Sequence, residues 1–168
     1  LSAGNGKDGV MPYDLNTTLF TDYASKYRVI FLPPTAPGSA TAKPATYQDS
    51  RQGITATLDF PVGTVISKTF TFRKEDADGK LLSENVVETR LLIKRETTAG
   101  KNWVGLPYIW QKDAAGNNTK ALLSLAGGSA SVAWDYLDPN PNVKKNGARA
   151  RYTGTASQYT IPAALNCI

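Results

Sequence analysis

The chain has 168 residues, a hydrophobic content of 41%, a charged content of 20% and a net charge of +5. This length suits a single domain that buries a core without disulfides or metals. No apolar run approaches the roughly 18 residues that a membrane-spanning helix requires. The basic residues are scattered except at 143–145 and 149–151. The composition therefore excludes a transmembrane segment and argues against nucleic-acid binding.

The predicted elements are mainly short strands, because β-branched and aromatic runs are bounded by Gly, Pro, Asn or Asp. In chain order these runs cover residues 27–33, 53–60, 64–72, 86–97, 102–110, 129–137, 148–155 and 157–162. Two short helices are expected, at 19–27 and at 119–127. Long loops rich in Pro, Ala and Ser or Asn are expected at 33–53 and 138–150. The pattern predicts a single all-β domain over 1–168, an antiparallel β-sandwich or an open barrel-like sheet.

A β-hairpin is the most specific local prediction. Asp78-Gly79 separates two alternating runs, and this dipeptide favours a tight turn with positive φ. Folding the chain there places Lys68 roughly opposite Glu88, with Arg90 on the same face as Glu88. Because apolar neighbours make a lone charge costly, one hypothesis is a half-buried Lys68–Glu88 pair that includes Arg90. The alternative is a solvated face on which these charges are exposed.

Few residues suggest catalysis or metal binding. The chain has no histidine and one cysteine, so Ser-His-Asp and Cys-His sites, histidine zinc sites and thiolate cages are excluded. Asp76 and Asp78 have the alternate spacing of a calcium loop, but residue 87 is valine where such a loop needs glutamate. These observations predict a non-catalytic domain without a metal site.

Aromatic residues leave two interpretations open. An exposed row that includes Trp103, Trp110 and Trp134 would stack sugar rings and make a carbohydrate-binding module. The more favoured interpretation is that these side chains pack in the core, since large aromatic residues contribute much of a small domain's buried area.

The single cysteine, Cys167, stands one residue before Ile168. A c-type haem site has the pattern C-x-x-C-H, in which two thiols form thioethers and the histidine ligates iron. A cysteine at this position is what a cut inside such a motif leaves. The chain also begins with Leu1 rather than Met, so we expect a processed or excised piece of a longer protein that continues past Ile168.

Five stretches carry a resemblance to a known family. In order they are "MPYDLNTTLFTDYASKYRVIFLPP", "LDFPVGTVISKTFTF", "VETRLLIKRE", "NWVGLPYIWQKD" and "YTIPAALNC", which extend from Met11 to Cys167. Together they resemble an uncharacterised family of exported bacterial proteins found beside parallel β-helix repeat proteins. In that family the β-rich module runs into a C-x-x-C-H motif. Gln111 departs from the family pattern, which has asparagine there.

The resemblance implies that Cys167 is a thioether attachment point for haem c, with the other haem residues outside this sequence. It implies a periplasmic, extracellular or cell-surface location and a redox or cell-surface protein partner. We therefore expect a scaffold or docking module, attached to a c-type haem segment, in extracytoplasmic electron transfer. The alternatives are a carbohydrate- or surface-binding module and a self-assembling structural subunit of the cell surface, which would be a homo-oligomer.

Overall fold

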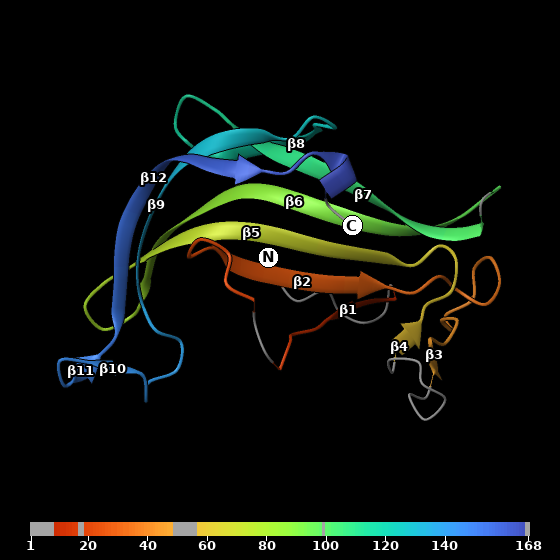
Figure 1. The fold of residues 1–168 in the computed structure, drawn as a ribbon, viewed down its shortest axis with the longest axis horizontal. Helices are drawn as coiled ribbons and strands as arrows, with labels where there is room; N and C mark the ends of the chain where they lie inside the picture. Colours follow the sequence, from red (N-terminus) through yellow and green to blue (C-terminus); the bar gives the residue numbers. More distant parts are fainter. Residues whose placement is uncertain (1–8, 17–18, 49–56, 99, 167–168) are drawn as a thin grey trace.

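The computed structural model describes residues 9–16, 19–48, 57–98 and 100–166, and almost all of its regular structure is β (Figure 1). Its strands are β1 (Val10–Pro12), β2 (Ser25–Phe31), β3 (Thr46–Gln48), β4 (Thr57–Asp59), β5 (Val65–Glu75), β6 (Leu81–Thr97), β7 (Gly100–Lys112), β8 (Asn118–Leu123), β9 (Gly128–Leu137), β10 (Lys144–Lys145), β11 (Ala148–Arg149) and β12 (Arg151–Ile161). A 3₁₀ turn, η3 (Ala164–Asn166), follows the last strand. Within the described residues, no helical segment has the length and apolar character that a bilayer crossing needs.

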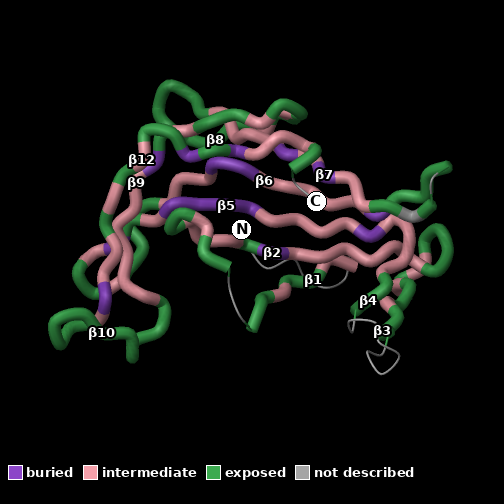
Figure 2. The backbone as a smooth tube through the Cα atoms, in the orientation of Figure 1, coloured by how far each residue is buried: buried purple, intermediate pink, exposed green. Residues whose placement is uncertain are grey.

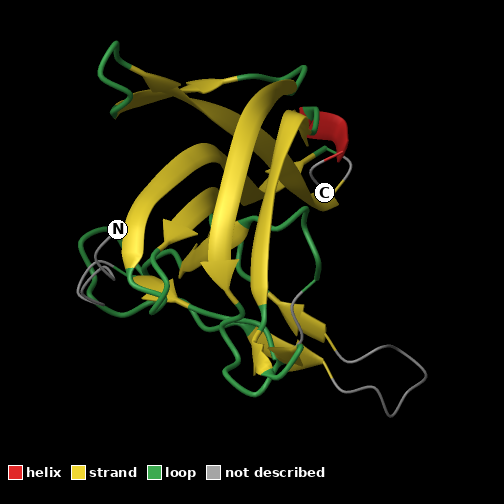
Figure 3. Cartoon of the chain, turned by 90° about the vertical axis from the view of Figure 1, so that its left-hand side faces the viewer, coloured by secondary structure: helices red, strands yellow, loops and turns green. Residues whose placement is uncertain are grey.

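One large sheet dominates the molecule, with neighbouring strands in the order β1-β2-β5-β6-β7-β8. These neighbours are antiparallel, and β9 and β12 form a long antiparallel hairpin beside them. A single parallel bridge, Lys74 to Asp135, joins this hairpin to β5. In Figure 1 the hairpin rises at the left end of the sheet and bends over it, and Figure 3 shows the same curvature from the side. The prediction of an all-β fold is confirmed, in the form of an open sheet folded over on itself.

The core lies where the β9–β12 hairpin crosses β5 and β6. Its buried members are Phe72, Val87, Val132, Tyr159 and Ile161, two from the sheet and three from the hairpin. Figure 2 shows long buried stretches on β5 and β6 and exposed loops at both ends of the sheet. Burying such side chains contributes about 1.5–3 kcal/mol each, so this crossing holds the fold together.

Two glycines allow the backbone to pack closely at the crossing. A Cβ atom on Gly154 would overlap the indole ring of Trp134 on the neighbouring strand. A Cβ atom on Gly127 would overlap the backbone at Ile161 and Pro162, and Gly127 has a φ of +73°. The turn before β9 therefore fits against the end of β12 only because residue 127 is glycine.

The predicted hairpin at Asp78-Gly79 forms between β5 and β6. Gly79 has a φ of +86°, and one carboxylate oxygen of Asp76 accepts hydrogen bonds from the backbone N–H groups of Asp78 and Lys80. Glu75 pairs with Leu81 next to this turn. Local turn chemistry was therefore sufficient to locate the hairpin.

The register farther along this hairpin differs from the predicted one. If the pairing of Glu75 with Leu81 continued unchanged, Lys68 would lie opposite Glu88. Two irregularities shift it, one between Lys74 and Glu75 and one between Phe70 and Thr71. Each adds one residue on β6, so that Lys68 lies opposite Arg90 and Phe70 lies opposite Glu88.

Both predicted helices are wrong. Residues 25–27 belong to β2, and Asp22 and Tyr23 just before them have positive φ values of 47° and 65°, which no right-handed helix contains. In the second segment, residues 119–123 belong to β8, which pairs with β7, and a turn follows from Ser124 to Gly127. Pairing with β7 overrides the helical preference of Ala and Leu there.

Other predictions differ in detail. Residues 148–155 and 157–162 were expected to form two strands, but β12 runs through both, with an irregularity between Ala156 and Tyr159. Residues 57–59 of the predicted strand 53–60 form β4, while 53–56 lie outside the described residues. The expected loop at 33–53 contains the isolated bridge between Pro34 and Ala42 and the short strand β3.

Candidate functional site

Cys167, the predicted haem attachment residue, lies outside the described residues. The chain that leads to it is firmly held. Tyr159 and Ile161 are 5% and 2% exposed, and the backbone N–H of Ala164 donates to the carbonyl oxygen of Leu125 at 2.9 Å. The end of β12 nearest the cysteine is therefore among the most deeply buried parts of the molecule.

Glu88 and Arg90 form an ion pair inside the sheet–hairpin crossing. The Glu88 side chain is fully buried, and its two carboxylate oxygens accept from the Arg90 guanidinium at 2.8 and 2.5 Å. The Tyr159 hydroxyl donates to the same carboxylate at 2.7 Å. Burial, together with the neighbouring Glu88 charge, strongly raises the pKa of Tyr159. The ion pair of Glu88 is with Arg90, its neighbour two residues along β6 and a member of the predicted charge group, and the contact between Lys68 and Glu88 stays a prediction.

Three cations lie in register across neighbouring strands. Arg28 on β2 is opposite Lys68 on β5, which is opposite Arg90 on β6. Arg28 pairs with Asp14 at 2.9 Å. Burial lowers the pKa of the Lys26 ammonium group, and the charges of this row lower it further. Like charges opposite one another are unfavourable, and the carboxylates of Asp14 and Glu88, paired with Arg28 and Arg90, offset part of that repulsion.

The Phe70 ring packs beside the cations Arg90 and Lys26 on this face of the sheet. The Arg90 guanidinium lies 4.1 Å from the centre of the Phe70 ring, and the Lys26 ammonium lies 5.7 Å from it. Contacts of this kind are worth about 0.5–2 kcal/mol. Since Phe70 and Arg28 are both buried, the row contributes to the interior rather than to an open surface.

The three tryptophans do not form one platform. Trp103 and Trp110 are seven residues apart on β7, so their side chains leave opposite faces of the sheet. Trp110 donates to the Thr89 hydroxyl at 3.0 Å, while Trp134, on β9, stacks on Tyr23 with ring centres 4.9 Å apart. All three side chains are half-buried. The arrangement expected for stacking a row of sugar rings is absent among these residues.

The described residues contain no group of three or more Cys, Asp or Glu side chains placed to hold a metal ion. The Asp76–Asp78 spacing that resembled a calcium loop serves the hairpin turn, in which Asp76 accepts two backbone hydrogen bonds.

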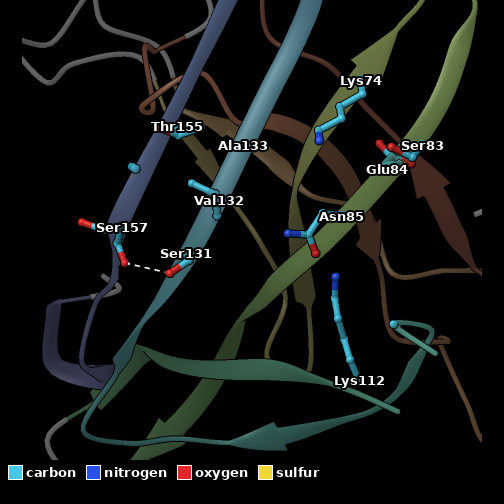
Figure 4. A pocket seen from close by; sticks show the side chains of 12 residues that line it. Lys74, Ser83, Glu84, Asn85, Lys112, Ser131, Val132, Ala133, Thr155 and Ser157 are labelled. Atoms are coloured by element: carbon cyan, nitrogen blue, oxygen red, sulfur yellow. Dashed lines mark hydrogen bonds between the residues drawn. The ribbon is translucent and has the colours of Figure 1, made fainter. Parts of the chain in front are cut away.

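A cavity of about 640 Å³ lies between the β5–β6 hairpin, the end of β7 and the β9–β12 hairpin (Figure 4). Lys74 and Lys112 extend toward Asn85 from opposite sides of it. The side-chain oxygen of Asn85 is buried and has no hydrogen-bond partner among the described residues. The sequence analysis missed this site, because its members come from five separated strands and share no motif.

Comparisons with known proteins add no relative. No protein-family model matches the chain, no curated protein matches its sequence, and no solved structure matches its fold.

Proposed function

We propose that this chain is a non-catalytic docking scaffold of an exported protein, and that it holds a c-type haem segment attached at its C-terminal end. The observation that carries the proposal is the anchoring of the chain just before Cys167. Tyr159 and Ile161 lie in the core, and η3 is tied to the turn after β8 through Leu125. A group attached at Cys167 would therefore be tethered to a well-packed part of the sheet.

The residues present fit a haem group only in part. The chain supplies one thiol and no histidine, so the second thioether and the axial imidazole would come from other residues of the protein. Tyr159 and Ile161, near the end of β12, are buried in the core and do not provide an apolar wall for an attached haem. Leu125 and Leu165 are 59% and 90% exposed beside the anchor, and they are the apolar side chains that could cover an attached group.

A tethered scaffold would act through position and charge. A short link to a fixed strand restricts the volume that the attached group explores, which raises its effective concentration at a docked partner. The net charge of +5 favours association with an acidic partner, with rates that fall as salt rises. The resemblance described above supports an extracytoplasmic redox partner of this kind.

The experiment is to express the full-length gene product in a bacterial host that matures c-type cytochromes. We expect a Soret band, and haem that stays with the polypeptide on a denaturing gel. Cys167→Ala should abolish covalent attachment, or move the pyridine haemochrome band to longer wavelength because one vinyl group remains unreacted. A full-length protein without haem, or one whose haem content and spectrum ignore Cys167→Ala, would contradict the proposal.

A further inference from the structure

The cavity beside Asn85 has the character of a binding site. Most of the residues that line it carry polar side chains, and they come from β5, β6, the end of β7 and the β9–β12 hairpin (Figure 4). Gly116, in the turn between β7 and β8, closes one side. The cavity shares no lining residue with the segment next to Cys167, so a ligand bound here does not depend on haem attachment.

Two ammonium groups supply the positive charge of this cavity. Lys74, near the end of β5, and Lys112, the last residue of β7, direct their side chains toward Asn85. Within the part of the chain that the structure describes, neither ammonium group has an ion-pair or hydrogen-bond partner. Two cations of like sign that converge at one place repel each other, and an anion between them relieves that repulsion.

The nearby carboxylates are already engaged. Glu84 also lines the cavity, but its oxygens accept from the Thr71 hydroxyl at 2.7 Å and from the Tyr27 hydroxyl at 2.8 and 3.0 Å. Asp135, which lies opposite Lys74 in the parallel bridge, accepts from Arg151 and Thr153. The hydrogen bond from Arg151 lowers the pKa of Asp135. Glu84 still contributes its negative charge to the lining, and the Lys74 charge also lowers the pKa of Asp135, but neither acid forms an ion pair with Lys74 or Lys112 within the described residues.

A strand irregularity opens the opposite wall. The pairing of β12 with β9 shifts between Ala156 and Tyr159, and the Ser131 hydroxyl donates to the Ser157 carbonyl oxygen at 3.0 Å across the gap. Bulges of this kind recur beside functional sites, where they redirect side chains. Ser131, Thr155 and Ser157 thereby add hydroxyl groups to the lining.

We propose that this cavity binds an oxyanion, with the ammonium groups of Lys74 and Lys112 on either side of one carboxylate, sulfate or phosphate group. The side-chain NH₂ group of Asn85 and the hydroxyls of Thr155 and Ser157 are the neutral donors beside it, whereas the Ser131 hydroxyl already donates to the Ser157 carbonyl oxygen. No aromatic ring is among the described residues that line the cavity, so recognition rests on charge and hydrogen bonds rather than on stacking. The oxyanion comes either from a free inorganic ion or from an acidic sugar, and the experiment distinguishes these sources.

The test is titration of the protein with sulfate, phosphate, galacturonate and galactose, followed by calorimetry and by amide chemical shifts around Asn85 and Ser131. We expect the anions to bind and galactose not to bind. Equal affinity for sulfate and galacturonate would identify a site for inorganic ions, whereas tighter binding of galacturonate would identify an acidic sugar. Binding of galactose as tightly as galacturonate, or anions that leave these amide shifts unchanged, would overturn the proposal.

A matched pair of variants separates a built site from general attraction. Lys74→Gln with Lys112→Gln removes two charges from the cavity, and Lys144→Gln with Lys145→Gln removes two from the exposed strand β10. We expect the first pair to weaken anion binding at least tenfold and the second to change it less than twofold. Equal losses in both pairs would show nonspecific attraction and would overturn the site. Thermal unfolding of both pairs checks that each protein is folded.

Discussion

Two polar side chains on β6, only three residues apart, differ in whether their buried oxygens have hydrogen-bond partners. Glu88 is fully buried, and both its oxygens are engaged by Arg90 and Tyr159. Asn85 has a buried oxygen without a partner among the described residues, and it faces a cavity with two lysines. The Glu88 carboxylate is satisfied within the fold, whereas the Asn85 oxygen still lacks a donor among the described residues, and the lysine ammonium groups beside it lack an anionic partner there.

The β9–β12 hairpin causes this difference. Near Glu88, β12 supplies Tyr159, whose hydroxyl closes the network. Near the cavity, the irregularity at Ser157 interrupts the pairing of the same two strands. The closed network is costly to break because a buried charge then loses its partners. At the open site, Lys74 and Lys112 have no ion pair or hydrogen bond with the described residues that a substitution would break.

The largest expected effect comes from breaking the closed network. Glu88→Ala should lower the free energy of unfolding by about 3–5 kcal/mol, because it leaves the Arg90 guanidinium without its buried partner. Replacing both residues, as Glu88→Leu with Arg90→Leu, should cost much less. Urea unfolding of the two variants measures the difference. A double variant as unstable as Glu88→Ala would indicate that the sites contribute independently rather than as a pair.

A second loss of stability is expected where the two strands of the β9–β12 hairpin pack closely at Gly154 and Trp134. Gly154→Ala places a methyl group against the Trp134 ring, which itself stacks on Tyr23. We expect a loss of about 1–3 kcal/mol from overpacking. Thr155→Ala, at the next position on β12 and exposed, is the control and should stay within about 0.5 kcal/mol of the parent. Tolerance of Gly154→Ala would mean that the hairpin can move away from the sheet.

Tyr159→Phe tests the third partner of Glu88 alone. It removes one hydrogen bond and should cost about 1 kcal/mol at neutral pH. It should also reduce the loss of unfolding free energy at alkaline pH. Tyrosine ordinarily loses its proton near pH 10, and the folded state raises the pKa of Tyr159 through burial and the Glu88 charge. The unfolded chain therefore releases this proton first, so stability is intact below about pH 10 and falls as pH rises above it.

The measurement for Tyr159→Phe is the unfolding free energy between pH 8 and 11. The variant should lose less stability than the parent across the alkaline part of this range. Burial also raises the pKa values of Tyr13 and Tyr136, so some slope remains in the variant. Identical slopes in parent and variant would show that Tyr159 does not hold its proton more tightly in the folded state.

Local chemistry made part of this fold predictable from sequence. The Asp78-Gly79 turn and the alternating runs on either side located the central hairpin, because turn geometry depends on neighbouring residues. The pairing of Lys68 lies two residues beyond the expected Glu88, at Arg90, for a physical reason. Leu82 and Val87 are ordinary strand residues, and nothing in their sequence marks them as the extra residues that shift the register.

Tertiary contacts determined the rest. The Ala-Leu-Leu stretch at 121–123 favours a helix in isolation, yet it pairs with β7 as the edge strand β8. The convergence of Lys74 and Lys112 on Asn85 follows from the register of the sheet and from the path of the hairpin, neither of which a single sequence specifies. Candidate ligand sites assembled from several strands are therefore invisible to motif reasoning.

The smallest expected effect on stability comes from the two lysines at the cavity beside Asn85. Lys74→Gln with Lys112→Gln should change the free energy of unfolding by no more than about 0.5 kcal/mol, because both side chains are exposed and lose no internal hydrogen bond or ion pair with the described residues. A slight gain is reasonable, since the change removes repulsion between two like charges. Urea unfolding in low salt, where such repulsion is least screened, is the appropriate measurement. A loss above about 1 kcal/mol would mean that these lysines stabilise the fold as Glu88 and Arg90 do, and that the contrast between the two positions on β6 is false.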